Sequence, residues 1–410
     1  MTRSFVYASL FPDGALSLHG TPAHVDIQNH LAHFSRATWP ESSIPSVTSF
    51  LSSLDRAGSP LADLVGALLL NRARFHRRLR YLLVDFESLQ LAADSIDAIT
   101  PPSHWSASPF STHLQSFVYL LKLRVMRYWL LLGFELDLFS NHDALIALWY
   151  LDYVIGSELQ HRNAISAHVA KVEEADAAAA ARPIGAQISK RKQKIAARAA
   201  AVLGHVDETP APPPPRESHE TTWLVAMQHL VRGVLRFLAA LRCAGIVSTW
   251  SPSSMSDGHV AFHRRFAPLL SVTSPTPLSF AQFEDNFPPT PPLAGRSRAR
   301  EVLRGAHESL QSAKAAYERL SRAVNDGPRG VSVQYRAVLA GMTRTAVANG
   351  VNVALAQRVI GADKQDETDK KDKKDDKKDD GKDKKKKESV KVETKFVKWV
   401  PVVTLVVTEL

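Results

Sequence analysis

Apolar residues recur at helical spacing along most of the chain. One stripe starts at Leu61 and resumes beyond Arg80, and the pair Pro101-Pro102 ends it. Residues 111–132 are apolar on nearly every side, which predicts a helix buried between other helices. Residues 1–60, in contrast, are rich in Ser, Pro and His and show little period, so we expect them to be poorly ordered.

The segment after Gly133 predicts a turn between two buried helices. Ser140 followed by Asp143 is the pattern of a helix N-cap with an acidic residue in the first turn. Apolar and aromatic residues then continue at helical spacing to Arg162, which predicts a helix over 143–162. Two such helices joined by a short turn should pack antiparallel as a helical hairpin.

Beyond residue 209 the pattern changes several times. Pro210–Pro215 predicts a stiff linker, and an amphipathic helix with apolar positions from Trp223 to Leu241 follows it. Residues 248–295 contain many Ser and Pro and are expected to be mostly irregular. Helical patterns return at about 298–324 and 332–348.

The end of the chain indicates strands. Val351 to Val359 alternates apolar and other residues, which predicts a strand, and the β-branched run Phe396–Val407 predicts its partner. Between them, residues 363–388 hold 12 Lys and 11 acidic residues, a composition that cannot bury apolar surface. We therefore expect a β-hairpin interrupted by a long disordered loop.

These patterns predict a mainly α protein: an irregular multi-helix array with a small C-terminal β-hairpin and long disordered loops. The expected segments are an N-terminal segment (1–60), a helical domain with the buried hairpin (61–209), a Pro-rich linker (210–220), a helical region with a Pro/Ser-rich loop (221–350) and the β-hairpin region (351–410).

The formal charge of +10 is unevenly distributed. It gathers in two patches that are either contact sites for RNA, a ribosome surface or an acidic protein, or simply solvated helix faces. The first patch consists of Arg72, Arg74, Arg77, Arg78 and Arg80, and the second of Arg182, Lys190, Arg191, Lys192, Lys194 and Arg198.

A single cysteine, Cys243, excludes an internal disulfide and a multi-Cys zinc site, and it is expected to be a buried small side chain. The apolar run Phe117–Leu132 carries Lys122, Arg124 and Arg127 near its middle, where each charge would be costly in lipid. We therefore predict a core helix, no membrane contact and a cytoplasmic protein.

Other residues with functional chemistry have simpler interpretations. His259 and His263 have the spacing of metal ligands but no adjacent third ligand, so surface histidines are favoured, as for His30 and His33. Glu135, Asp137 and Asp143 fit helix-terminus and turn positions better than an acid pair. An aromatic set at helical spacing is favoured as core over a ligand cage: Trp129, Phe134, Trp149, Tyr150 and Tyr153.

The block Gly133–Asp143, continuing through Trp149-Tyr150-Leu151, resembles in amino-acid sequence the large auxiliary subunits of the N-terminal acetyltransferase C complex, NatC. Four further blocks resemble the same family in the same order. They are Asn71–Phe86, the basic tract Lys190–Lys194, His263–Pro268 with Phe283, and the pair Val351–Leu355 and Trp399–Leu405.

The resemblance implies a non-catalytic scaffold without a cofactor. It would hold a catalytic acetyltransferase subunit and a small Sm-like subunit and support co-translational acetylation of nascent N-termini at the ribosome. Residues 1–60 lack the family's N-terminal block, so we expect the chain to correspond to the family's C-terminal half, as a truncated product or part of an incompletely predicted gene.

Acetyl-CoA binding in the usual acetyltransferases needs a glycine-containing turn between a strand and a helix. Arg182–Gln187 and Arg358–Asp363 approach that pattern, but both fail at its last position. The alternative functions are a stand-alone helical protein that binds RNA or the ribosome, and an enzyme whose site the sequence does not reveal.

Overall fold

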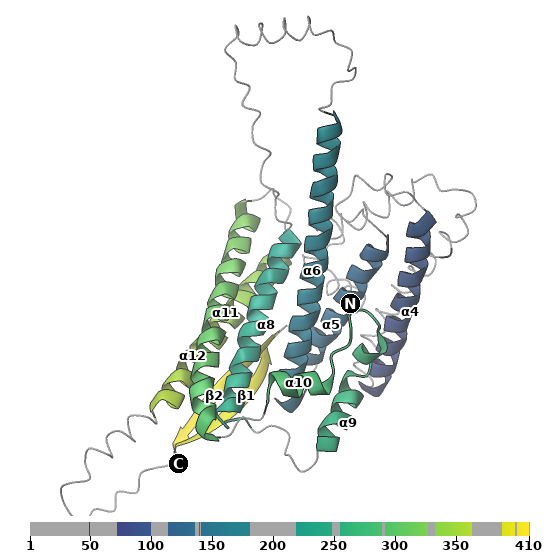
Figure 1. Ribbon diagram of the computed structural model, residues 1–410. Coiled ribbons are helices and arrows are strands. Elements are labelled where there is room, and N and C mark those ends of the chain that lie inside the picture. Colours follow the sequence, from purple (N-terminus) through teal and green to yellow (C-terminus); the bar gives the residue numbers. More distant parts are fainter. Residues whose placement is uncertain are drawn as a thin grey trace, which may run out of the picture.

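The computed structural model describes residues 49, 72–99, 114–135, 139, 141–180, 219–247, 255–288, 292–326, 333–362, 388–397 and 400–409. Its long helices lie side by side (Figure 1). A two-stranded sheet packs against the last helix that the structure describes. The predicted mainly α class is confirmed. Residues 1–48, 50–71 and the Lys/Asp-rich 363–387 lie outside the described residues.

The first three described helices are α4 (Arg72–Ile99), α5 (Leu114–Glu135) and α6 (Asn141–Ala180). The predicted pair of packed helices is confirmed as α5 and α6, and Asp143 lies in the first turn of α6. The predicted end at Arg162 is wrong, because α6 continues to Ala180 through residues of high helix propensity. Its second half extends beyond the neighbouring helices (Figure 1).

Helix α8 (His219–Cys243) is the amphipathic helix that the sequence predicted. It begins inside the expected linker 210–220, whose last two residues are therefore helical. α8 packs against α6 on one side and against α11 (Pro292–Asp326) on the other. It is also the helix among the described residues that is long and apolar enough to cross a membrane, over Thr221–Cys243, but 72% of that apolar window is buried inside the molecule.

The expectation that 248–295 is mostly irregular is wrong. The segment contains α9 (Met255–Phe266), the 3₁₀ turn η3 (Leu269–Ser271), α10 (Phe280–Asn286) and the start of α11. Phe262 and Phe266 share a buried face of α9. The apolar pattern of this helix is short and lies between prolines, so it is hard to recognise in the sequence. A capping box starts α10, because the Ser279 side chain accepts from Gln282 N while the Gln282 side chain accepts from Ser279 N.

The predicted strand at Val351–Val359 is also wrong, since α12 runs from Val333 to Ala362. Val353, Ala356 and Ile360 are buried at helical spacing, whereas Val351 is 64% exposed. The hairpin does exist, but its strands are β1 (Glu388–Val397) and β2 (Val400–Glu409), paired antiparallel with Val397 opposite Val400. The Lys/Asp-rich segment thus separates α12 from β1 rather than two paired strands.

One hydrophobic core runs from α4 to β2, where Val403 is fully buried. β2 is tied to α12 by the backbone N–H of Val403, which donates to Asn349 Oδ1 at 3.1 Å. Cys243 is only half-buried, against the expectation of full burial, because it lies at the end of α8. The division of the chain into the five predicted segments stays a prediction.

Candidate interaction site

The first basic patch lies on the opening turns of α4. Arg72, Arg74, Arg77 and Arg78 are helical, and Arg80 is described as exposed. Side chains of residues 72–79 lie outside what the structure describes, as do Arg182 and the whole tract 190–198. The second patch follows the end of α6 in sequence. The role of both patches as contact sites stays a prediction.

A buried lysine holds α4 in place against α5. Lys122 of α5 is fully buried and its Nζ donates to Glu87 Oε1 at 2.6 Å and to Gln90 Oε1 at 2.7 Å, both on α4. The Thr273 hydroxyl donates to the other oxygen of Glu87. Burial lowers the pKa of Lys122, and the hydrogen bonds from Lys122 and Thr273 outweigh burial to hold the pKa of Glu87 below its usual value. The Arg72–Arg80 patch therefore sits on a helix of fixed orientation.

Three arginines surround one buried carboxylate between α5 and α6. Glu158 is fully buried, and its oxygens lie 3.0 Å from Arg127 Nε, 3.5 Å from Arg162 Nη2 and 3.6 Å from Arg124 Nε. Burial alone would raise the pKa of Glu158, but the three positive charges outweigh it and lower that pKa. The Arg127 guanidinium also lies over the Trp223 ring of α8, 5.2 Å from its centroid. This cluster joins three helices.

Sequence reasoning missed the cluster although the signal was present. In the sequence, Lys122, Arg124 and Arg127 argue against a lipid environment. Charges inside an apolar helix require buried partners of opposite sign, and Glu158 follows on the next apolar helix. The same pattern therefore predicts that buried acidic partners exist, but not which residues they are.

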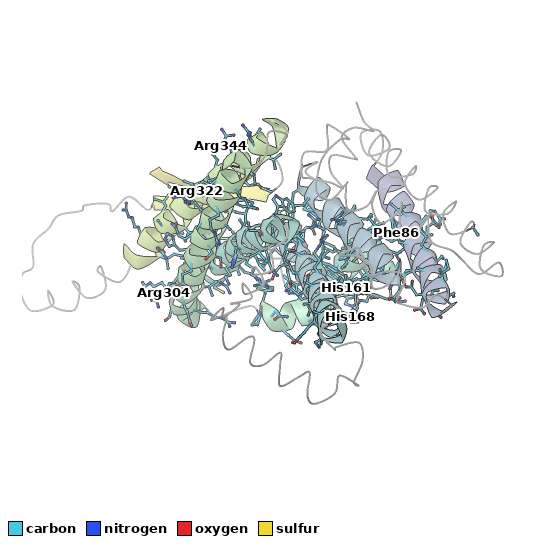
Figure 2. All side chains as sticks on the ribbon, turned by 90° about the horizontal axis from the view of Figure 1, so that it is seen from above. Phe86, His161, His168, Arg304, Arg322 and Arg344 are labelled. Carbon is cyan, nitrogen blue, oxygen red and sulfur yellow. The ribbon has the colours of Figure 1, made fainter. Side chains whose placement is uncertain are left out.

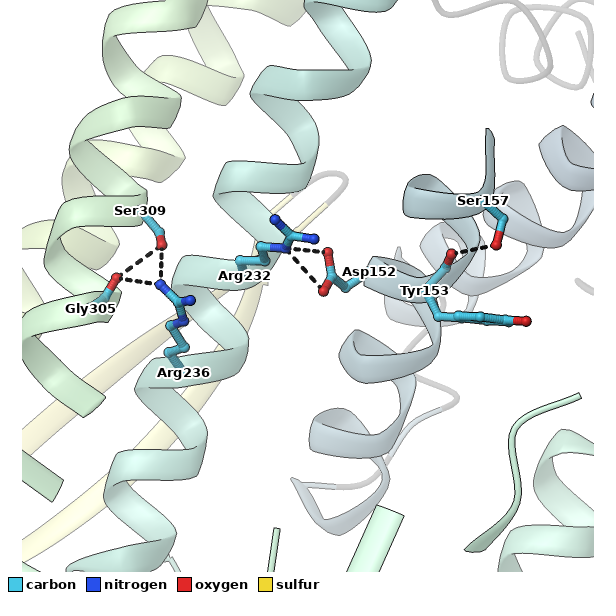
Figure 3. Close-up of polar contacts among 7 residues, drawn as sticks. All are labelled: Asp152, Tyr153, Ser157, Arg232, Arg236, Gly305 and Ser309. Carbon is cyan, nitrogen blue, oxygen red and sulfur yellow. Dashed lines mark hydrogen bonds and ion pairs between the residues drawn. The ribbon is translucent and has the colours of Figure 1, made fainter. Parts of the chain in front are cut away.

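A polar bridge connects α6, α8 and α11 (Figure 3). Arg232 Nε of α8 donates to both Asp152 oxygens, at 2.8 and 3.1 Å. One turn further, Arg236 Nη1 donates to Gly305 O at 3.1 Å and to Ser309 Oγ at 2.9 Å on α11. Burial outweighs Arg232 and raises the pKa of Asp152. These contacts fix the rotation of α8 between its neighbours.

The aromatic set is core, as predicted. Trp129, Phe134 and Tyr150 are buried, and Trp149 and Tyr153 pack half-buried against them. Phe266 of α9 stacks on Phe139 and on Tyr150, with centroids 6.0 and 5.8 Å apart. The Tyr150 hydroxyl accepts from Leu278 N at 3.1 Å, and burial raises its pKa.

The other residues singled out from the sequence are structural or exposed. Asp143 is buried and pairs with Arg265 at 3.3 Å, and the side chains of Glu135 and Asp137 lie outside the described part. His259 and His263 lie on an exposed face of α9 with their Nε2 atoms 3.3 Å apart. Within the described ranges, no three His, Cys, Asp or Glu side chains gather in a way that could hold a metal ion. His30 and His33 lie outside these ranges.

The two candidate acetyl-CoA loops have different outcomes. Arg182–Gln187 is outside the described residues. Arg358–Ala362 forms the last turn of α12, so it does not adopt the strand-to-helix turn that would hold a pyrophosphate.

An open groove runs between α11 and α12, with a volume of about 440 Å³. Its lining comprises Glu318, Ser321 and Arg322 from α11 and Ala340, Thr343 and Arg344 from α12. No pattern in the sequence indicates this groove, because a groove between two helices depends on their packing.

Comparison with known proteins relates this architecture to one family. Residues 1–403 match the profile of the family described as "NAA35-like, TPR repeats". The NatC auxiliary subunit N-alpha-acetyltransferase 35 of Rattus norvegicus is 26% identical over 297 residues, covering 70% of this chain and 37% of the rat protein. The Homo sapiens protein is 26% identical over 258 residues, covering 61% and 32%.

Solved structures agree with this at the level of the fold. A chain of the apo NatC complex has a TM-score of 0.60 at 16% identity and covers 93% of this chain and 50% of itself. A chain of the NatC complex bound to Arl3 peptide and CoA has a TM-score of 0.58. This chain thus spans about a third of the two curated relatives and half of the structural ones. Because the family profile extends over nearly its whole length, the chain belongs to the NAA35-like family with TPR repeats.

Proposed function

We propose that this chain is a non-catalytic auxiliary subunit of a NatC-type N-terminal acetyltransferase complex. The observation that carries the proposal is the family match over residues 1–403, in a family whose curated relatives are named NatC auxiliary subunits. The role is that of a scaffold: it holds the catalytic, acetyl-CoA-dependent subunit and a small Sm-like subunit, and supports co-translational acetylation of nascent chains that begin with Met and a bulky apolar residue.

The internal contacts support a scaffold because they make a rigid body. Buried charges join α4 to α5 and α5 to α6, and the polar bridge joins α6 through α8 to α11. A rigid helical surface loses little conformational freedom when a partner docks, which favours affinity. Such a body contributes binding surface and leaves acetyl transfer to another subunit.

The basic patches suit a position at the ribosome in the cytoplasm. Arg80 is exposed on a helix that Lys122 anchors, and Lys190–Lys194 would follow the projecting half of α6. Arginine and lysine clusters bind phosphates with a strong dependence on salt. Ribosome association should therefore weaken steeply as salt rises.

Co-expression with the catalytic and small subunits of the same organism tests this function. A stable complex should co-purify, and acetyl transfer to a peptide substrate should require the catalytic subunit. The full-length auxiliary subunit of a relative, with its own partners, is the positive control. Failure of this chain to co-purify while the control assembles, or acetyl transfer by this chain alone, would overturn the proposal.

A further inference from the structure

Helix α12 carries a second, outward-facing stripe in addition to its buried one. Its buried face, which includes Leu339, Met342, Val353 and Ile360, lies in the core. On the exposed side, residues recur at alternating spacings of three and four and continue after a gap of seven. We call them the outer stripe: Ala337, Ala340, Arg344, Val347, Val351 and Arg358.

The outer stripe has the form of a helix-docking seam. Spacings of three and four place residues along one line of a helix, which is the pattern that a second helix packs against. Val347 is 43% exposed and Val351 is 64% exposed, although α12 already has its apolar face in the core. The fold therefore does not require apolar residues at these positions.

The groove between α11 and α12 extends this surface. Ala340 and Arg344 belong both to the stripe and to the groove, where Arg322 of α11 faces them. Figure 2 shows Arg322 and Arg344 near each other on the α11–α12 side of the molecule, away from His161 and His168 of α6. A docking helix would thus contact α12 and the neighbouring edge of α11.

The charge of this surface specifies the partner's chemistry. α12 carries three arginines, Arg336, Arg344 and Arg358, and no acidic residue. None of the three has an ion-pair partner among the residues that the structure describes. The one acidic groove residue, Glu318, lies 3.6 Å from Lys314 on its own helix. The surface therefore has an apolar centre flanked by positive charge.

We propose that the outer stripe and the α11–α12 groove bind an amphipathic helix with acidic flanks, contributed by a partner subunit. This rests on the proposed scaffold function and specifies where one partner docks. A second copy of this chain fits poorly, because it would bring Arg344 and Arg358 against the same arginines. Bare phosphates fit poorly too, because they gain nothing from Val347 and Val351.

A synthetic helical peptide with leucine at the a and d heptad positions and glutamate at e and g is the direct probe. Fluorescence anisotropy should show saturable binding to the wild-type chain. Val351→Glu and Arg344→Glu should each weaken it about tenfold or more, since the first puts a charge into the apolar seam and the second reverses a contact charge. A peptide with lysine in place of every glutamate should not bind.

Two exposed positions elsewhere provide matched control variants. Leu91→Glu on α4 replaces a leucine whose side chain is 72% exposed, and Arg264→Glu reverses an exposed charge on α9. Both should bind the acidic peptide as the wild type does. An equal loss with these controls would overturn the proposal, since the effect would then be nonspecific.

Other outcomes identify other occupants. Binding of a single-stranded RNA that Arg344→Glu abolishes and Val351→Glu leaves intact, with no peptide binding, would mean that charge alone is recognised. Sedimentation of the wild type as a dimer that Val351→Glu dissociates, again without peptide binding, would identify a second copy as the occupant. Either result contradicts the proposal.

Complex formation separates this proposal from the scaffold function. If the wild-type chain and the Arg344→Glu and Val351→Glu variants all co-purify equally with the other subunits and none binds the peptide, the docking surface is wrong and the function stands. If the wild type does not co-purify with any subunit but binds the peptide with the expected loss in both variants, the function fails and the surface stands.

Discussion

The helix pair α5–α6 buries charged residues in its interior, whereas the pair α11–α12 carries its charged residues on the surface. In α5–α6, Lys122, Arg124, Arg127 and Glu158 are buried, and the charges act between helices. In α11–α12, Arg322, Arg344 and Arg358 are exposed, and the buried stripes contain no charged residue. The first pair uses charge to fix the fold, whereas the second leaves charge available to a partner. Substitutions should therefore affect stability in the first pair and binding in the second.

The largest effect is expected at Glu158. Glu158→Gln removes the carboxylate that faces three buried arginines, and leaving buried charge uncompensated costs about 3–5 kcal/mol of unfolding free energy. Urea denaturation measures the loss. Glu174→Gln, at an exposed position of the same helix, is the control and should change stability by less than about 0.5 kcal/mol. Equal stabilities of the two variants would show that the cluster does not hold the fold.

Acid should reduce the difference between the wild type and Glu158→Gln. The pKa of Glu158 is below its ordinary value of 4.5 in the folded chain, so its contribution is fully present above that value. It is lost as pH falls through the folded pKa. His161, whose pKa burial lowers, destabilises both proteins in acid and so cancels in the difference. Denaturation curves at a series of pH values check this, and a constant difference down to strong acid would contradict it.

A smaller loss is expected where α8 and α11 approach closely. A Cβ on Gly233 would lie 2.6 Å from Leu310 Cγ, and Leu310 is buried, so Gly233→Ala should cost about 1–3 kcal/mol of unfolding free energy. Gly341→Ala on α12 meets nothing within 4 Å and should stabilise by about 0.5–1 kcal/mol through helix propensity. Thermal unfolding of both variants measures the two changes, and stabilisation by Gly233→Ala would contradict the close packing of α8 and α11.

The smallest effect on stability is expected at the outer stripe. Arg344→Glu and Val351→Glu alter exposed side chains, so unfolding free energy should change by no more than about 0.5 kcal/mol. Chemical denaturation alongside the peptide-binding assay checks this. A loss as large as that of Glu158→Gln would mean that these residues support the fold and would remove the distinction between the two pairs.

The sequence predicted what depends on local pattern. The apolar run at 111–132 and the turn before Asp143 were enough to place the packed helices α5 and α6. The pattern at 351–359 misled, because alternate apolar residues fit a strand as well as a helix over so short a span. Only packing against α11 and β2 selects the helix that buries Val353, Ala356 and Ile360.

The interaction site was less predictable because its parts come from separate elements. Glu158 lies 31 residues from Arg127, and no spacing rule connects the two. The outer stripe could have been found by testing 337–358 for a helical period, but its exposure depends on which face of α12 the core uses. The basic patches are visible in the sequence as clusters, and their role as contact sites stays a prediction.

Hydrogen–deuterium exchange of this chain, alone and in the complex with its co-expressed partner subunits, compares the two pairs in one measurement. The account in which α5–α6 fixes the fold and α11–α12 binds a partner predicts new protection of α12 across residues 337–358 on assembly and unchanged protection in the buried parts of α5 and α6. Unchanged exchange across α12, with new protection confined to α5 and α6, would contradict it.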